Sequence, residues 1–260
     1  MDNHSKIIIV MPAYNAAKTL KKTYAEIPEE YRRDIILVDD ASRDNTVDLA
    51  REMGLKVIIH EKNLGYGANQ KTCFGAALAV GADLVVMVHP DHQYDATVIP
   101  DLVKPILEGK ADAAFGSRLL GGYPMEGGMP GWKYNANIFL TALANLVFRR
   151  YLTEIHSGFR AYSRQYLETV RFEINSNDFV FDTEIIAQGM ACKFFFQEVP
   201  IVTRYFEDAS SINFRKSVQY GLGICVVLAR YILHQKKILT FKQFLPKGES
   251  TNNKLDLTQN

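Results

Sequence analysis

The stretch DLVVMVHPDHQYD, residues 83–95, is the part of the sequence that most strongly indicates the fold. After Asp83 it continues as an uninterrupted apolar run, as in a buried strand, and it ends in a polar loop with two histidines and two aspartates. Three earlier runs share this apolar character, and they read IIIVMP at 7–12, DIILVDD at 34–40 and LKVIIHE at 55–61. Helical patterns alternate with the runs, at about 16–26, 45–53, 66–80 and 97–108.

This alternation of strands and helices predicts βαβ units and therefore a parallel sheet. The strands are apolar throughout rather than at alternate positions, which is typical of strands that helices cover on both faces. Sheets of this kind bind ligands at the carboxyl ends of their strands. The polar residues that follow each run are therefore candidate ligand-binding residues.

The second half of the chain contains longer elements. The segment LLGGYPMEGGMPGW, 119–132, holds five glycines and two prolines, and we expect it to be a mobile connection over the site. An amphipathic helix is predicted at 133–152, and a strand, interrupted by Pro200, at 194–206. A further helix is predicted at 217–238.

The composition is that of an ordinary globular protein of 260 residues, with 47% apolar and 23% charged residues. A formal net charge of +1 argues against nucleic acid as a partner. The three cysteines lack the spacing of a metal site and are odd in number, which indicates a reducing compartment. We expect a main domain over 1–213, a C-terminal helical region over 214–243 and a disordered polar tail over 244–260.

The most apolar late segment, GLGICVVLARYIL at 221–233, is shorter than the roughly 20 residues that a membrane span requires. The apolar residues at 7–10 are too few for a signal peptide, so we expect a cytoplasmic protein. The helix at 217–238 either lies on a membrane surface or packs on the main domain or on a second subunit. Its apolar face would consist of Val218, Leu222, Cys225, Val226 and Leu233, with Arg230, Lys236 and Lys237 near lipid headgroups.

The polar motifs at the strand ends permit several interpretations when each is taken alone. PAYN at 12–15 is a turn. Asp39 and Asp40 suit ribose hydroxyls or a metal ion, whereas Ser42 and Asp44 are typical caps of the next helix. The two histidines and two aspartates of HPDHQYD could be a metal site or only a polar loop.

The segment KNLGYGAN at 62–69 brings Gly65 and Gly67 close together, as in a dinucleotide-binding motif. Gln70 stands where the third glycine of that motif is required, and the segment follows the wrong strand. A Rossmann oxidoreductase is therefore disfavoured, although the glycines would still let backbone approach a nucleotide.

Taken in order, these motifs resemble the GT-A glycosyltransferases of family 2, in particular the dolichol-phosphate mannose synthase-like branch. The resemblance runs over about residues 6–214. It rests on PAYN at 12–15, VDDASRDNT at 38–46, KNLGYGAN at 62–69, the loop 89–95, GSR at 116–118, HSGFR at 156–160 and the FDTE that ends in Glu184. It implies an α/β fold of the GT-A type, with a mostly parallel central sheet flanked by helices and a C-terminal helical appendage.

In this family the loop after the fourth strand carries Asp-x-Asp, which holds Mg²⁺ or Mn²⁺ against the donor diphosphate. His89 stands here in place of the first aspartate, and Asp91 keeps its position. An imidazole binds Mn²⁺ but is a poor ligand for Mg²⁺. The resemblance therefore implies a divalent cation, Mn²⁺ or Mg²⁺, with Asp91, Gln93 and His89 as its candidate ligands.

The same resemblance implies the other site residues. The expected nucleotide-sugar-binding residues are Pro12, Tyr14, Asn15, Asp39, Asp40, Asn63, Gly65, Asp91 and Arg118. Asp91 and Arg118 would also stabilise the leaving diphosphate, and Glu184 or Asp182 would take the proton of a hydroxyl acceptor. The expected acceptor-binding residues are Arg160, Arg204 and Ser157. The two arginines suit a phosphate, because a guanidinium group binds phosphate through two hydrogen bonds.

The resulting functional hypothesis is an inverting transferase that moves a hexose from GDP-mannose or a UDP-hexose to a polyprenyl phosphate at the membrane surface. Two alternatives remain. One is a family 2 transferase with a saccharide or other hydroxyl acceptor in glycan synthesis, because SSINF at 210–214 lacks the lysine expected of a lipid-phosphate site. The other is a nucleotide-sugar-binding protein without catalytic activity.

Overall fold

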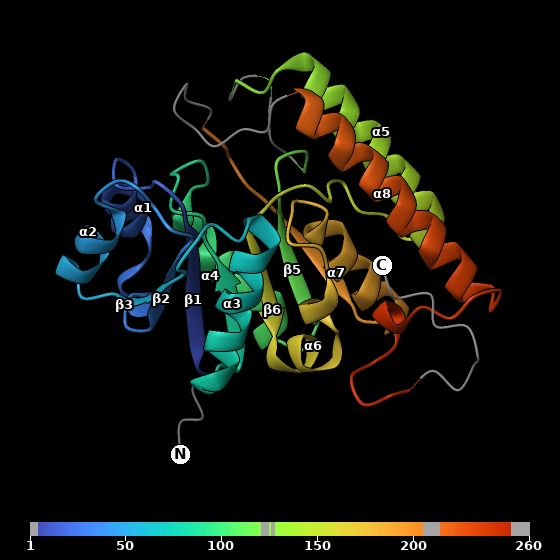
Figure 1. Cartoon of the computed structure of the whole chain (residues 1–260), viewed down its shortest axis with the longest axis horizontal. Coiled ribbons are helices and arrows are strands. Elements are labelled where there is room, and N and C mark those ends of the chain that lie inside the picture. Colours follow the sequence, from blue (N-terminus) through green and yellow to red (C-terminus); the bar gives the residue numbers. More distant parts are fainter. Residues whose placement is uncertain (1–4, 121–124, 126–127, 205–213, 251–260) are drawn as a thin grey trace.

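The computed structural model describes residues 5–120, 125, 128–204 and 214–250. A seven-stranded sheet crosses the molecule in the order β3-β2-β1-β4-β6-β5-β7 (Figure 1). The strands are β1 (Ile7–Ala13), β2 (Ile35–Asp39), β3 (Lys56–Ile59), β4 (Leu84–Met87), β5 (Ala113–Ser117), β6 (Arg160–Ser163) and β7 (Phe196–Pro200). β6 runs antiparallel to both of its neighbours, and the other neighbouring strands pair in parallel. The predicted mostly parallel α/β sheet is thus confirmed.

Helices cover both faces of this sheet. One face carries α1 (Leu20–Glu26), α2 (Thr46–Glu52) and α4 (Ile99–Leu107). The other carries α3 (Tyr66–Ala79), α5 (Gly131–Phe148), α6 (Arg164–Thr169), α7 (Phe181–Ala191) and α8 (Phe214–Gln235). Short 3₁₀ turns lie at Glu29–Tyr31, Ala96–Val98, Phe172–Ile174 and Lys242–Phe244.

Successive residues of each central strand enter opposite cores, which explains why these strands are apolar at every position. In β1, Ile8 and Val10 belong to the core under α3 and α7, whereas Ile9 and Met11 belong to the core under α1 and α4. All four side chains are buried. β3 differs because it is an edge strand, and none of its residues is fully buried.

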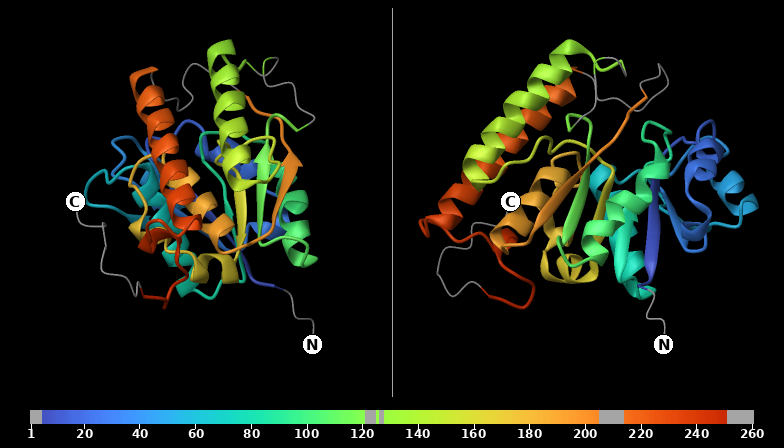
Figure 2. Two further views of the ribbon diagram at one scale, coloured as in Figure 1. Left: turned by 90° about the vertical axis from the view of Figure 1, so that its right-hand side faces the viewer. Right: turned by 180° about the vertical axis from the view of Figure 1, so that it is seen from behind.

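Helices α5 and α8 form a pair at one side of the molecule (Figures 1 and 2). The inner side of α8 packs on α7, and Tyr231 meets the ring of Phe148 of α5 edge-on at 5.0 Å. Gly223 lets α8 approach closely, since a Cβ at this position would lie 2.4 Å from Cγ2 of Val180. α8 is therefore part of the packed fold on its inner side.

Several boundaries differ from those predicted, for identifiable reasons. The strand expected at 194–206 ends at Pro200, which has no N–H to continue the ladder. The helix expected at 133–152 ends at Phe148, where Arg149 adopts a left-handed conformation with φ of 53°. The connection 119–132 and the SSINF segment lie partly outside the described residues.

The chain after α8 returns to the body of the molecule. The Arg171 guanidinium donates to the carbonyls of Leu245 and Pro246 at 3.1 and 3.0 Å, and Phe244 is buried. Residues 242–250 of the described chain therefore lie on the main domain, although the sequence places most of them in a polar tail. Residues 251–260 lie outside the described part.

Candidate active site

The carboxyl ends of β1, β2, β4, β5 and β7 lie at one edge of the sheet, and the antiparallel β6 begins there. We call this edge the carboxyl edge. A predicted motif lies at the carboxyl end of each of β1, β2, β4 and β5, and Arg160 of HSGFR opens β6. The fold therefore brings the motifs from 12–15, 39–46, 89–95, 116–118 and 156–160 to one place.

The loops that follow β1 and β2 are tied together. The buried Asp39 carboxylate accepts from the backbone N–H of Ser42 at 2.9 Å and from the Ser42 hydroxyl. That hydroxyl in turn accepts from the backbone N–H of Asn15 at 2.8 Å. The Asn15 side-chain oxygen accepts from the N–H of Arg43 at 2.8 Å. The result is a rigid double loop from which Tyr14 stays exposed, next to the start of the carboxyl edge.

Asp40, in contrast, is used to shape the loop after β3. Its carboxylate accepts from the N–H groups of Leu64 and Gly65 at 2.8 and 3.0 Å, and it contacts His60 Nδ1 at 2.8 Å. The side chain of Asn63 donates to the Asp40 carbonyl at 3.2 Å. These contacts support the loop itself, and nucleotide binding by Asp40 and Asn63 stays a prediction.

The glycines of KNLGYGAN permit a close approach of two protein segments. Gly65 has φ of 98°, and a Cβ there would lie 2.6 Å from the carbonyl oxygen of Asn177. The N–H of Gly67 donates to the same carbonyl at 2.8 Å. In this structure the glycines thus let the segment before α7 pack closely on the start of α3, and nucleotide binding by Gly65 stays a prediction.

A partly buried cluster lies near the carboxyl edge, around the ring of Tyr66. The imidazole of His89 stacks on this ring with a centroid separation of 5.6 Å and an interplanar angle of 4°. The Tyr66 hydroxyl donates to Asp182 at 2.9 Å and lies 3.5 Å from His89 Nε2. Burial lowers the pKa of His89, against the opposing effect of the carboxylates of Asp91 and Asp182, so the neutral imidazole is favoured.

Arg160 braces this cluster from the sheet. Its guanidinium donates to the carbonyls of Ser157, Asp182 and Ile155 at 2.6, 3.1 and 2.9 Å, and it pairs with the Asp182 carboxylate at 3.4 Å. Burial alone would lower the pKa of Arg160, but the nearby Asp182 raises it above its ordinary value. The predicted acceptor residue is therefore a buried cation that holds the HSGFR segment against α7.

Gly158 of HSGFR makes room for His89. A Cβ at this position would lie 2.6 Å from His89 Nε2 and 2.8 Å from its Cδ2. The N–H of Gly158 also donates to the Tyr94 hydroxyl at 3.2 Å. Two motifs that are far apart in the sequence are thus in direct contact.

The HPDHQYD loop is fixed by backbone contacts. Asp91 accepts from the N–H of Gln93 at 3.1 Å, and the Gln93 carbonyl accepts from the N–H of Arg204 at 2.9 Å. Among the residues that the structure describes, no three His, Cys, Asp or Glu side chains lie close enough together to hold a metal ion. Protein side chains in this part of the chain therefore do not form a closed metal site, and a cation would need further oxygen ligands.

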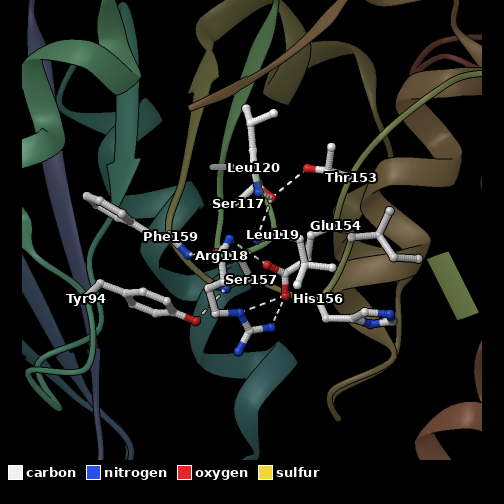
Figure 3. A network of polar contacts seen from close by, with 12 residues as sticks. Tyr94, Ser117, Arg118, Leu119, Leu120, Thr153, Glu154, His156, Ser157 and Phe159 are labelled. Atoms are coloured by element: carbon white, nitrogen blue, oxygen red, sulfur yellow. Dashed lines mark hydrogen bonds and ion pairs between the residues drawn. The ribbon is translucent and has the colours of Figure 1, made fainter. Parts of the chain in front are cut away.

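Arg118 is held by a carboxylate that the sequence did not single out (Figure 3). The buried Glu154 accepts from Arg118 Nε and from its backbone N–H, both at 2.8 Å, and also pairs with Nη2. Glu198 fixes the segment before Glu154 by accepting from the Thr153 N–H at 2.7 Å and its hydroxyl at 2.7 Å. Glu154 carries no motif signal of its own, since it lies just outside HSGFR.

The two candidate bases on α7 differ in their contacts. Asp182 belongs to the Tyr66 cluster, where the Gln70 side chain also donates to it at 3.1 Å. Glu184 accepts from the backbone N–H of Ser176 at 2.6 Å. The side chains of residues two apart on a helix point in directions about 200° apart, so the two carboxylates face different surroundings.

Arg204 lies at the other side of the HPDHQYD loop. It pairs with Glu26 at 2.8 Å and lies 4.0 Å from Asp95. About one third of its side chain is exposed, at 34%. The fold therefore separates the partly exposed Arg204 from the buried Arg160.

The comparison with known proteins agrees with this arrangement. The chain matches the model of glycosyl transferase family 2 over residues 8–171. It is 28% identical over 218 residues to the UDP-N-acetylglucosamine–dolichyl-phosphate N-acetylglucosaminyltransferase of Methanococcus voltae, covering 77% of this chain and 86% of that protein. It is 30% identical over 210 residues to a low-salt glycan biosynthesis hexosyltransferase of Haloferax volcanii, covering 79% of this chain and 49% of that protein.

Among solved structures, the glucosyl-3-phosphoglycerate synthase of Mycobacterium tuberculosis, crystallised with Mn²⁺, UDP and phosphoglyceric acid, superposes with a TM-score of 0.67. The identity is 16%, with 88% of this chain and 79% of that chain covered. At this identity the likeness shows the fold, which is that of the GT-A transferases. With the family match spanning β1 to α6, the chain belongs to glycosyltransferase family 2.

Proposed function

We propose that the protein transfers a hexose, with inversion, from a nucleoside-diphosphate sugar to a polyprenyl phosphate. The observation that carries this proposal is the convergence of Asp39, Asp91 and Arg118 at the carboxyl edge of a family 2 chain. The Methanococcus voltae relative acts, by its name, on dolichyl phosphate, which supports a lipid phosphate as the acceptor.

The nucleoside half of the donor would bind at the double loop after β1 and β2. Tyr14 offers an exposed ring for a base, and Asp39 offers carboxylate oxygens that suit ribose or base N–H groups. Because Ser42 and Asn15 already fix this loop, little ordering is required on binding. Pro12 ends the apolar part of β1 and directs the chain into the loop.

The residues present fit a divalent cation that is shared with the substrate. Mg²⁺ is commonly bound in proteins by one or two carboxylates together with substrate phosphates, and Asp91 supplies one carboxylate at the carboxyl edge. Gln93 and His89 are the further candidate ligands, although His89 Nε2 lies near the Tyr66 hydroxyl. Such a cation would neutralise charge that develops on the leaving diphosphate.

Arg118 supplies a fixed positive charge at the same edge. Glu154 orients its guanidinium before any substrate binds, so no reorganisation is needed as charge develops on a phosphate. A guanidinium carries five N–H donors in a fixed plane and binds phosphate oxygens as readily as carboxylate oxygens. We infer that Arg118 binds the leaving diphosphate or the acceptor phosphate.

The state of the two candidate bases favours a phosphate acceptor. Asp182 is engaged by Tyr66, Gln70 and Arg160, and Glu184 by the N–H of Ser176. A hydroxyl acceptor needs a carboxylate that can take its proton, whereas a phosphate is already an anion. Attack by a phosphate oxygen on the anomeric carbon, opposite to the departing diphosphate, requires no proton transfer.

The test is a transfer assay with labelled GDP-mannose and UDP-hexoses, offered to a polyprenyl phosphate and to saccharides, with Mn²⁺ or Mg²⁺. We expect a labelled lipid product with one donor, and we expect Glu184→Gln to retain it. If the unaltered protein used only a saccharide as acceptor, and Glu184→Gln lost this transfer, the hydroxyl-acceptor alternative would be established. Absence of transfer to every acceptor would leave only a binding protein.

A further inference from the structure

We propose that α5 and α8 together form a docking surface for an anionic lipid bilayer. The surface, called here the α5–α8 face, comprises Trp132, Phe139 and Leu146 of α5 and Val218, Leu222 and Val226 of α8. This proposal rests on the proposed function, because a docking surface is useful to the reaction only if the acceptor is a lipid. It names the surface that would bring the carboxyl edge to that lipid acceptor. Bilayer binding itself needs no turnover, so the two proposals fail separately.

Both helices expose large apolar side chains along their outer sides. On α5, Phe139 and Leu146 are 67% and 77% exposed, and they lie seven residues apart on one side of the helix. On α8, Leu222 is 63% exposed, with Val218 and Val226 one turn before and after it. Single exposed apolar residues are ordinary, but two parallel rows on adjacent helices form a patch.

The two rows belong to the same side of the molecule. In Figure 2, left, α5 and α8 run next to each other and both face the viewer, with the sheet behind them. The buried residues of the pair, among them Ala144 and Phe148 of α5 and Ile224 and Leu228 of α8, belong to the core under this layer. The exposed rows are therefore the outer surface of one helical layer.

The inner packing of α8 indicates that this helix lies on a bilayer rather than across it. By length and composition, residues 216–235 could cross a membrane. Crossing would remove Tyr231 from Phe148 and Phe244, and would separate Gly223 from Val180. Contact through the outer side alone keeps this packing and still buries the exposed row, as in interfacial helices.

The charged residues of the helical layer are all basic. Residues 131–150 and 214–237 contain eight Lys or Arg and no Asp or Glu. Since the whole chain has a net charge of +1, the rest of the chain carries a net charge of −7. Basic residues beside an apolar helix face are the recognised pattern for anionic lipid surfaces.

This charge also decides between a bilayer and a second copy of the chain. A two-fold contact would place the same basic layer on both sides of the interface, where like charges repel. An anionic bilayer instead offers the opposite charge to Arg149, Arg150, Arg230, Lys236 and Lys237, which are all exposed. The bilayer is the occupant that satisfies both the apolar rows and the charge.

The position of the α5–α8 face relative to the site supports the same conclusion. The amino ends of α5 and α8 lie at the end of the molecule where the carboxyl edge is (Figure 1). His156 of HSGFR contacts the Tyr220 hydroxyl of α8 at 3.0 Å through Nδ1. Docking through this face would therefore bring the acceptor side of the site close to the headgroups.

The experiment is vesicle co-sedimentation of the full chain, with phosphatidylcholine vesicles and with vesicles that contain phosphatidylglycerol, at low and high salt. The variants are Phe139→Asp with Leu146→Asp on α5, and Leu222→Asp on α8. Leu107→Asp at the end of α4 is the matched control, since Leu107 is 48% exposed and lies on the other face of the sheet. Circular dichroism would confirm that each variant is folded.

We expect binding to the phosphatidylglycerol vesicles that weakens with salt, and a loss of about tenfold or more for the α5 and the α8 variants alike. The Leu107→Asp control should bind as the unaltered protein does. Unchanged binding of the α5 variant, or no binding of the unaltered protein, would overturn the proposal. So would a concentration-dependent dimer in sedimentation velocity that these variants abolish, because the occupant would then be a second copy.

Discussion

At the scale of single residues, Glu154 is the clearest addition to the site. Replacing it by Gln removes the charge that orients Arg118 and leaves this guanidinium without its carboxylate. We expect kcat/KM for sugar transfer to fall by about 10²-fold, similar to the loss of one oriented donor at other charged transition states. The matched control is Glu168→Gln, which breaks the exposed Arg164 pair and should leave the rate unchanged. Equal rates for the Glu154 variant would show that Arg118 needs no orientation.

A second residue-scale prediction concerns Gly158. In Gly158→Ala the added methyl would lie 2.6 Å from His89 Nε2, so the imidazole must leave its stacked position on Tyr66. We expect a loss of about 1–3 kcal/mol in the free energy of unfolding, measured with urea. Gly75→Ala in α3 meets no atom within 4 Å and should be neutral or slightly stabilising. If both variants are equally stable, His89 is not fixed by this contact.

His156 gives a prediction for pH. Burial lowers the pKa of His156 in the folded chain to about 4, whereas in the unfolded chain this histidine has its ordinary pKa. As the pH falls below about 6.5, the unfolded state binds a proton that the folded state does not, so stability decreases down to about pH 4. We expect this window to cost about 1–3 kcal/mol and to be smaller in His156→Gln. An unchanged pH profile in that variant would assign the loss to other groups.

At the scale of elements, the close packing of α8 on α7 can be tested with two glycines of α8. Gly223→Ala would place a methyl 2.4 Å from Val180, whereas Gly221→Ala meets only Leu140, at an ordinary 3.8 Å. We expect Gly223→Ala to lower the free energy of unfolding by about 1–3 kcal/mol, and Gly221→Ala to be neutral or stabilising. Thermal and urea unfolding would measure both, and a stable Gly223→Ala would mean that α8 shifts freely on α7.

The elements also show what the sequence can and cannot predict. The strands of the first half were predictable, because their runs of Ile, Val and Leu are buried on both faces. β5 (AAFGS) and β6 (RAYS) were not predicted, since short strands of small and polar residues lack that signal. Their pairing depends on β7 and β4, which are distant in the sequence.

The same distinction applies to the site. The convergence of Asp39 and Asp91 followed from their positions at predicted strand ends, because parallel strands end at one edge. The place of Arg118 came only from the family resemblance, since β5, which precedes it, was not predicted. The contacts among Tyr66, Gln70 and Asp182 could not be predicted, since they join α3 to α7 across the core. The burial of Arg160 was missed for the same reason, because only the fold shows which carbonyls surround it.

At the scale of the whole molecule, the two proposed binding surfaces belong to one rigidly packed unit. In the proposed function the carboxyl edge would offer Asp91, Arg118 and the double loop to a sugar nucleotide, and the α5–α8 face would offer an apolar, basic layer to a lipid surface. The two surfaces keep a fixed relation to each other, because α8 packs on α7, and α7 carries Asp182. A soluble donor and a lipid acceptor could thus meet at one edge.

Calorimetric titration can show whether the carboxyl edge binds a nucleoside diphosphate with a cation on Asp91. UDP and GDP would each be titrated with Mn²⁺, with Mg²⁺ and with EDTA, into the unaltered protein, Asp91→Ala and the exposed-surface control Asp101→Ala. We predict that one nucleotide binds and that its binding requires the cation. Its affinity should fall by about tenfold or more in Asp91→Ala and be unchanged in Asp101→Ala. Binding that is equally strong with EDTA, or that survives in Asp91→Ala, would contradict the account.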